Sequence, residues 1–318
     1  MTHIEIRPYD AAMTEEWDRF VLNSRNATFL HLRGYMDYHA DRFPDRSLVA
    51  LRKGRIIAAL PASGTGDTVC SHPGLTYGGL LLGEEATAAR VMKILEGMCA
   101  RYASGGFRTL VYRPVPHIYH RIPAEEDLYT LFRLGAVLDG RSPSTAVATF
   151  RRLPFGRERR NGIRKAMVSA TEIGQSYDFA TFWKILEENL MTGHNAVPVH
   201  SLAEIQLLAS RFPGNIRLYT ATQHSETVAG CVLYDTGEVI HTQYISASPR
   251  GKASGALDLL FSTLLDNIPP GCRYFDFGTS ALERYRLNET LIHQKEGFGA
   301  RTVCYDTYRL DLTALKAI

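Results

Sequence analysis

The sequence predicts an α/β protein made of two tandem domains, and three observations support this prediction. The chain has 318 residues, about twice the length of a typical domain. Strand-like runs and helix-like periodicity alternate along its whole length. The order of elements in the first half recurs in the second half at an offset of about 165 residues.

The first half begins with helices and continues with strands. Apolar spacing, turn residues and glycine positions define its elements. In chain order these are helices over 14–20 and 34–43, a hairpin of strands over 47–51 and 56–60, a Gly-rich segment over 77–82, a helix from about 84 to 102, and a strand over 107–112.

The second half repeats this order. Its predicted elements are a hairpin over 216–222 and 227–234, a strand over 238–246, a helix over 254–267 and a strand over 273–277. Arg133–Ala136 also has a counterpart in Gly297–Ala300. We expect an internal duplication, although any α/β protein alternates in a similar way. The predicted domains are residues 1–141 and 142–318, with a boundary that strands crossing between the halves would shift.

Composition narrows the function classes. The hydrophobic fraction of 45% and charged fraction of 22% are those of an ordinary globular protein. A net charge of +3 is too small to indicate nucleic-acid binding by itself. The charged start and the lack of a long apolar run predict a cytoplasmic protein without membrane insertion. Five scattered cysteines without a CxxC pair argue against disulfides and zinc, so no metal is expected.

The most informative stretch is Val239–Asp258, a predicted strand that runs through a small basic loop into an apolar helix. Gly251 and Gly255 allow close backbone approach, and Ser254 is a candidate helix cap. Arg250 and Lys252 add positive charge beside the amide donors of the helix N-terminus. The loop suits a pyrophosphate, although Gly and Ser also form ordinary capped turns.

This loop, Arg250–Ala256, resembles the acyl-CoA pyrophosphate loop of the GNAT (N-acyltransferase) superfamily, with loose spacing. Tyr274–Gly278 resembles the strand that follows, and Gln294–Arg301 resembles the closing Gly-Phe element of GNAT domains. With 27–39 and 195–202, the resemblance extends over most of the chain to FemAB-like bacterial proteins with two tandem GNAT-like domains. It implies domains that each hold a mixed, mostly antiparallel sheet flanked by helices.

The resemblance also implies an activity: direct transfer of an acyl group, with acetyl expected, from acyl-CoA to the amine of a small-molecule or sugar-nucleotide acceptor. The strand edge would hold the donor's pantetheine arm, and the loop its pyrophosphate. The expected donor-binding residues are Tyr244, Ile245, Ser246, Arg250, Gly251, Lys252, Ser254, Gly255 and Ala256.

The proton-transfer residues have several candidates. His293 lies roughly where many GNAT members carry the tyrosine that protonates the leaving thiolate, and Tyr285 is a neighbouring alternative. Candidates for the base that deprotonates the acceptor are His194, His200, His241 and Asp276. A packing or surface role is the alternative for each.

A basic cluster follows the predicted domain boundary. Its candidate substrate-binding residues are Arg159, Arg160, Arg164 and Lys165 on a helix that begins near Phe155. They could clamp phosphates of a nucleotide-linked acceptor or of tRNA, or form a solvated helix face. FemAB-like relatives use aminoacyl-tRNA, so an aminoacyl-tRNA-dependent transferase is the alternative function. A third reading is a binding protein without catalysis.

The first half has no comparable phosphate loop. Its counterpart, around Gly83–Ala86, is acidic and would repel an anion. We therefore expect a single donor site in the second domain, with the first domain supplying acceptor-binding surface and structural support.

Overall fold

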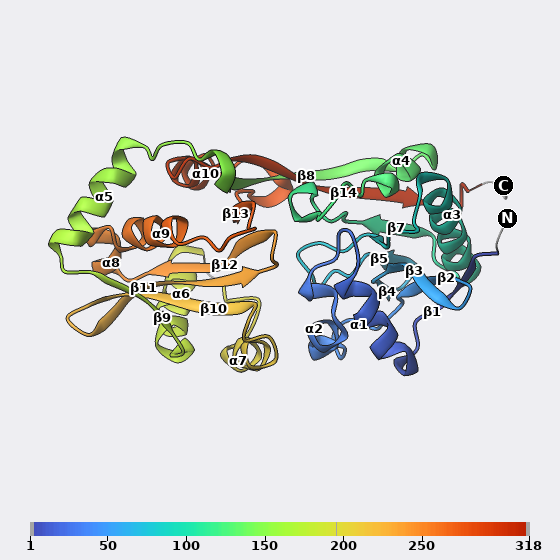
Figure 1. Ribbon diagram of the computed structural model, residues 1–318, viewed down its shortest axis with the longest axis horizontal. Coiled ribbons are helices and arrows are strands. Elements are labelled where there is room, and N and C mark those ends of the chain that lie inside the picture. The colour runs from blue at the N-terminus through green and yellow to red at the C-terminus, as the bar shows by residue number, and fades with distance from the viewer. Residues whose placement is uncertain (1–2, 195, 316–318) are drawn as a thin grey trace. The chain divides into compact units, whose positions relative to one another are not determined.

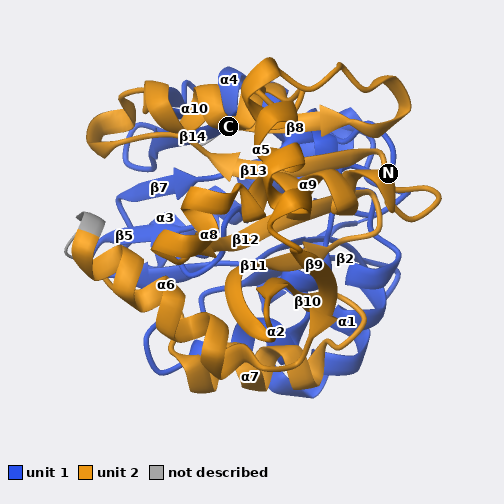
Figure 2. Ribbon diagram, turned by 90° about the vertical axis from the view of Figure 1, so that its left-hand side faces the viewer, with its two compact units in different colours: residues 1–142, 304–318 blue, residues 143–303 orange. Residues whose placement is uncertain are grey.

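The computed structural model describes residues 3–194 and 196–315, with the side chains of 193 and 194 outside this description. The chain divides into two compact units (Figure 2). Unit 1 comprises Met1–Ser142 with Cys304–Ile318, and unit 2 comprises Pro143–Val303. No helix in the described ranges is both long and apolar enough to cross a membrane.

Unit 1 contains two sheets, of order β1-β2-β3-β6 and β4-β5-β7-β14-β8, with helices around them (Figure 1). The helix α3 has its apolar side buried in the core of this unit. The elements are β1 (Glu5–Pro8), α1 (Thr14–Leu22), α2 (Arg33–Met36), β2 (Leu48–Arg52), β3 (Arg55–Leu60), β4 (Ser63–Thr65), β5 (Thr68–Cys70), β6 (Leu81–Leu82), α3 (Ala88–Ser104), β7 (Thr109–Tyr112), α4 (Glu126–Arg133), the start of β8 (Val137–Ala148) and most of β14 (Arg301–Asp311).

Unit 2 holds one sheet of order β8-β13-β12-β11-β10-β9. Among the described strands of this unit, only the β12–β13 pair is parallel, so the sheet is mixed and mostly antiparallel, as the sequence predicts. Besides β8, its elements are α5 (Arg157–Val168), β9 (Glu172–Ser176), α6 (Phe179–His194), α7 (Leu202–Arg211), β10 (Ile216–Gln223), β11 (Glu226–Asp235), β12 (Val239–Ala247), α8 (Pro249–Ser254), α9 (Ala256–Asp266), β13 (Tyr274–Thr279) and α10 (Glu289–Glu296).

The core of unit 2 lies between its sheet and α9. Phe261 of α9 packs against the rings of Phe275 and Phe277 on β13 and against Phe298. The side chain of Asn189, on α6, bonds Ser246 from the other face of the sheet. The two helices therefore cover opposite faces of the strands that carry the candidate site.

Unit 1 is completed by a strand from the C-terminal part of the sequence, whereas unit 2 is one continuous segment. β14 pairs with β7 in unit 1, from Tyr308↔Tyr112 to Asp311↔Thr109. The end of β8 pairs with β13 in unit 2, from Tyr274↔Ala148 to Thr279↔Ser144. Residues 304–318 thus group with unit 1, whereas the sequence assigned them to the second domain. This pairing and the burial of Leu310 and Leu312 in the core of unit 1 account for the difference.

Two predicted helices are interrupted. The expected helix over 34–43 is the single turn α2 followed by a 3₁₀ turn, Asp37–His39. The expected helix over 254–267 divides into α8 and α9 at Gly255, whose φ is 76°. A Cβ atom at Gly255 would lie 2.4 Å from the carbonyl oxygen of Gly162, so α5 approaches the chain too closely for any side chain there.

Candidate functional site

The candidate site lies between two parallel strands of unit 2, β12 and β13, which are paired at one end and then diverge. We call this arrangement a fork. β12 and β13 pair only through Val239↔Tyr274, Ile240↔Phe275 and His241↔Asp276 in the described part of the chain. β12 continues to Ala247 while paired with β11 on its other side. A register shift between Val232 and Leu233 of β11 lies opposite the start of this divergence, and such bulges bend strands. The divergence leaves room between the strands.

A cavity of about 470 Å³ occupies this fork. Its apolar lining comes from both faces of the sheet and its polar lining from Asn189, Ser246, Lys252, Gln294 and Lys295. Such a mostly apolar cleft with a few polar groups is typical of a ligand site. The apolar residues include Leu186, Leu190, Ile245, Leu257, Phe261, Phe277, Leu291 and Phe298.

His241 and Asp276 form a hydrogen-bonded pair at the last paired position of the fork. The distance from His241 Nδ1 to Asp276 Oδ2 is 2.8 Å, and the Asp276 side chain is fully buried. Asp276 Oδ1 accepts hydrogen bonds from Ser144 Oγ at 2.8 Å and from the Gly278 amide at 3.0 Å. These donors hold the carboxylate beneath Nδ1. A proton on Nδ1 leaves Nε2 as the basic nitrogen, as a general base requires.

Lys295 is a site residue that the sequence reasoning missed. Its side chain is buried and lines the cleft, and Nζ donates to the carbonyl oxygens of Gly278 and Thr279 at 2.9 and 2.8 Å. Burial lowers the pKa of Lys295 to about 8, against the opposing effect of the Asp276 charge. Its position three residues after the buried Ile292 on α10 was the available signal, since i and i+3 share a helix face.

The predicted donor loop is a short helix that is packed against protein. Its N-cap is Ser248, whose Oγ accepts from the Gly251 amide at 3.2 Å. Ser254, expected to be the cap, instead donates to the carbonyl oxygen of Gly251 at 3.2 Å because it lies at the end of α8. A Cβ at Gly251 would lie 2.2 Å from the Val228 carbonyl oxygen. Gly251 and Gly255 therefore allow backbone segments of the protein to approach each other closely. Ala256 is fully buried.

The basic cluster divides between two faces of α5. Arg159 faces α9, where its Nη1 donates to Asp258 Oδ1 at 2.7 Å. Burial raises the pKa of the Asp258 carboxyl, and Arg159 opposes that shift. Arg159 thus compensates a buried acid inside the fold. Arg160, Arg164 and Lys165 are exposed on the other face.

Several predicted donor residues lie at or beside the fork. Ile245, Ser246 and Lys252 line the cleft. The Tyr244 hydroxyl is 2.5 Å from Nδ1 of the buried His200, and burial raises the pKa of Tyr244 to about 12. Neither His200 nor Tyr244 lines the cleft. Arg250 forms an exposed ion pair with Glu226 at 3.0 Å.

Two other catalytic candidates, Tyr285 and His293, lie away from the cleft. Tyr285 is 44% exposed, and the side chain of His293 is 76% exposed with Nε2 3.8 Å from Glu158. Neither lines the cleft. The side chain of His194 lies outside the described residues. Among residues 3–194 and 196–315, no cluster of three or more His, Cys, Asp or Glu side chains is placed to hold a metal ion.

Comparisons with known proteins identify the fold. Residues 157–287 match the family model for the acetyltransferase (GNAT) domain. The structure is similar to the crystal structure of FemX, with a TM-score of 0.69, 12% identity, and coverage of 96% of this chain and 97% of that one. L-PGS from Bacillus licheniformis gives a TM-score of 0.60 and 14% identity, covering 98% of this chain and 94% of that one.

A third similar structure is a tandem GNAT protein from the clavulanic acid biosynthesis pathway. It gives a TM-score of 0.51 at 10% identity and covers 99% of this chain and all of that one, 100%. No curated protein matches the sequence. The predicted fold of two tandem GNAT-like domains is therefore confirmed, and at these identities the similar structures establish the fold alone.

Proposed function

We propose that the chain is an acyltransferase that transfers an acyl group, such as acetyl, from acyl-CoA to an amine, since residues 157–287 match the acetyltransferase (GNAT) domain model and the fold is similar to that of FemX. The acceptor would be a small molecule or a sugar nucleotide. The observation that carries the proposal is the His241–Asp276 pair at the fork, beside an open cleft that suits an extended donor arm. The acceptor and the cytoplasmic location expected from the sequence stay predictions.

The donor arm would lie along the edge of β12 that β13 leaves after His241. An extended ligand can add to such an edge through main-chain hydrogen bonds, as a peptide does in β-augmentation. The apolar walls from α6 and α9 exclude water from the thioester. Lys252 lies at the α8 end of the cleft, where a donor phosphate would gain from its charge.

The proposed chemistry needs one base and one oxyanion donor. His241 Nε2 removes a proton from the acceptor nitrogen, while Asp276 fixes the ring and stabilises the imidazolium. The nitrogen attacks the thioester carbonyl, the carbonyl oxygen becomes an oxyanion, and the C–S bond then breaks to release the thiolate. Lys295 uses two of its three N–H donors on Gly278 and Thr279, and the third suits the oxyanion.

Isothermal titration with acetyl-CoA and coenzyme A tests the donor. Leu190→Trp fills the cleft from a half-buried position, and Leu207→Trp, on an exposed site of α7, is the matched control. We expect micromolar binding by the wild type and the control, and at least about tenfold weaker binding by Leu190→Trp. Absence of binding to either ligand by the wild-type protein would contradict the proposal.

A second candidate, aminoacyl-tRNA-dependent transfer, has its own supporting observations. α5 covers the N-terminus of α9, where Gly162 and the buried Asp258 occupy the space of a pyrophosphate cradle. The opposite face of α5 exposes Arg160 and Arg164, which suit a nucleic-acid backbone. Both features favour an RNA-linked donor over a nucleotide held by the loop alone.

Binding of aminoacyl-tRNA at increasing salt concentration separates the two candidates. Charge reversal in Arg160→Glu and Arg164→Glu should weaken tRNA binding and reduce the salt slope by about 1 for each phosphate that is no longer neutralised. Lys184→Glu on α6 makes the same change in charge at another exposed site. Equal tRNA binding by all of these variants would exclude the second candidate.

A further inference from the structure

We propose that unit 2 has a second anion site, a basic hollow that binds the 3′-phosphate of coenzyme A while the acyl arm occupies the cleft. The inference rests on the proposed acyl-CoA donor. The hollow has a volume of about 470 Å³ and is separate in its lining residues from the cleft. We call it the basic hollow, and its lining includes Lys165, Gln223, His224, Arg250 and Ser254.

Three basic side chains from separate elements line the basic hollow. Lys165 comes from α5, Arg250 from α8, and His224 from the turn between β10 and β11. The opposing charge is Glu226, which pairs with Arg250 at 3.0 Å while both side chains are largely exposed. Lys165 has no ion-pair partner in the part of the chain that the structure describes. The hollow keeps an excess of positive charge, which favours a phosphate.

The backbone beside the hollow is strained. His224 and Ser225 have φ angles of 51° and 65°, both in the left-handed region that favours glycine. The corresponding turn of unit 1, between β2 and β3, has Lys53 and Gly54 at 51° and 73°. Unit 1 therefore uses glycine at its second position, and unit 2 does not. Ala170, which also lines the hollow, has a φ of 49°. Strain of this kind concentrates at functional sites.

The position of α8 relates the hollow to the donor. Lys252 of α8 lines the cleft, whereas Arg250, Ala253 and Ser254 of the same helix line the basic hollow. An α-helix with side chains is about 10 Å across, a span that a pyrophosphate joined to a ribose can cover. A donor lying over α8 would reach both. This placement provides phosphate contacts without the crowded N-terminus of α9.

The hollow suits one nucleotide phosphate better than a nucleic-acid backbone. Its three basic side chains line a single concave volume, whereas an RNA backbone requires a series of contacts along a surface. The exposed residues Arg160 and Arg164 do not line it. The favoured ligand is therefore a phosphate carried by a small nucleotide.

The test compares ligands that differ in the 3′-phosphate alone. Coenzyme A, dephospho-coenzyme A and adenosine 3′,5′-bisphosphate are titrated into the wild type, Lys165→Ala and His224→Asn. Asparagine keeps the turn because it tolerates the left-handed conformation. Controls are Lys184→Ala on α6 and Ser225→Gly, which relieves strain and retains the three side chains. We expect the wild type and both controls to bind coenzyme A about tenfold more tightly than the dephospho form.

In Lys165→Ala and His224→Asn, this ratio should fall to about one while binding of the dephospho form is unchanged. Equal wild-type affinities for the two forms, or equal losses for both in the variants, would overturn the proposal. If the wild type binds neither form, the proposed acyl-CoA donor fails, and the bisphosphate tests the hollow separately. Bisphosphate binding that His224→Asn abolishes then supports the hollow. Binding of a short RNA without the bisphosphate refutes it.

Discussion

The two units contain the same kind of fork, closed in one and open in the other. In unit 1, β5 and β7 pair in parallel through Thr68↔Thr109, Val69↔Leu110 and Cys70↔Val111, with α3 between them in sequence. In unit 2, β12 and β13 pair in parallel with α9 between them. The topology is shared, so the difference between the forks comes from what fills them.

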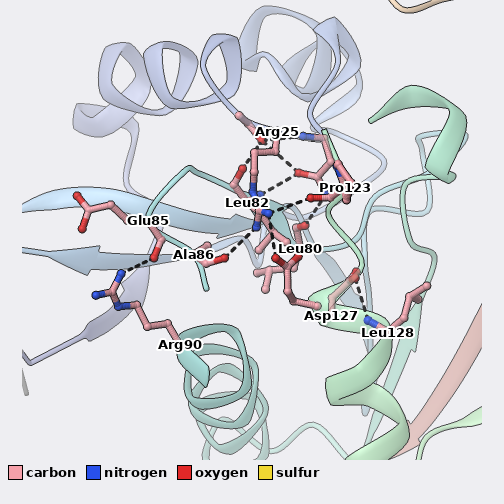
Figure 3. A network of polar contacts seen from close by, with 12 residues as sticks. Arg25, Leu80, Leu82, Glu85, Ala86, Arg90, Pro123, Asp127 and Leu128 are labelled. Atoms are coloured by element: carbon pink, nitrogen blue, oxygen red, sulfur yellow. Dashed lines mark hydrogen bonds and ion pairs between the residues drawn. The ribbon is translucent and has the colours of Figure 1, made fainter. Parts of the chain in front are cut away.

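The chain itself fills the fork of unit 1. The Ser71 amide donates to the Val111 carbonyl oxygen at 2.9 Å, and the Gly78 amide donates to that of Arg113 at 3.0 Å. The Tyr112 hydroxyl accepts from the Leu80 amide at 2.6 Å and donates to the buried Asp127 at 2.5 Å. In the same region, Arg25 donates to carbonyl oxygens of Ala86 and Pro123 (Figure 3).

This difference supports our proposal that the fold is structural in one copy and functional in the other. A fork whose main-chain groups are satisfied by its own loop has no capacity for a ligand, whereas the fork of unit 2 retains a cavity and a His–Asp pair. The sequence likewise predicts a single donor site, in the half of the chain that contains the open fork.

The largest effect is expected at the open fork. His241→Ala should reduce acyl transfer by about 10²–10⁴-fold because it removes the base. Donor affinity should stay unchanged, since His241 is absent from the cleft lining. Steady-state rates with acetyl-CoA and titration of coenzyme A measure the two quantities. Tyr112→Phe, in the closed fork, is the control and should leave the transfer rate unaltered. Full activity in His241→Ala would remove the functional distinction between the forks.

Lys295 should produce an alkaline limb in the pH profile, that is, a decline of the transfer rate at high pH. Its pKa of about 8 means that the ammonium loses its proton as pH rises through that value, and the oxyanion donor weakens. We expect the transfer rate of the wild type to decline above about pH 8. Lys295→Met should lower the rate about 100-fold and abolish this limb. A limb that persists in Lys295→Met assigns it to another group.

The closed unit should be the acid-sensitive one. Burial lowers the pKa of His31 to about 4 and of His72 to about 3. The unfolded chain binds protons at these residues from about pH 6.5 downward, whereas the folded chain does not, so the free energy of unfolding falls below that pH. At pH 5 the loss is about 2 kcal/mol for each histidine. Urea unfolding at pH values from 7 to 5 measures this loss of free energy. A smaller loss in His72→Gln than in the wild type would assign part of it to His72.

Gly78→Ala should have the smallest effect and act on stability alone. A Cβ there would lie 2.2 Å from the Ser71 carbonyl oxygen, because the loop closes tightly on itself. We expect a loss of about 1–3 kcal/mol in the free energy of unfolding, with coenzyme A binding retained. Gly174→Ala on β9 has no atom within 4 Å of the new Cβ and serves as the control. Equal stability of the two variants would show that the closed fork tolerates opening.

Much of the fork could be predicted from local sequence. The hairpin, β12 and β13 have apolar runs bounded by turn residues, and these patterns locate strands to within a few residues. His241 and Asp276 were both candidates because each lies on one of those strands. Their pairing depends on a parallel register between segments 35 residues apart, and no local pattern encodes that register.

The unpredicted features depend on contacts distant in sequence. Gly251 and Gly255 indicated close backbone approach, but the approaching partners are Val228 and Gly162 rather than a ligand. Arginine is a residue type that binds phosphates, so the sequence suggested a phosphate contact for Arg159. Only the packing of α5 on α9 shows that its partner is Asp258. A buried lysine such as Lys295 resembles any helix-surface lysine until the carbonyl groups of Gly278 and Thr279 are placed beside it.

The position of β14 in the sequence has a consequence for biosynthesis. β7 is translated before unit 2, whereas its neighbour β14 begins at Arg301, at the end of unit 2. Unit 1 therefore cannot finish folding until unit 2 has been translated, even though most of its residues are made first. Until then, the unpaired edge of β7 is exposed to other nascent chains. A ribosome-bound chaperone, or rapid completion of unit 2, would protect this protein more than one whose domains fold in order of synthesis.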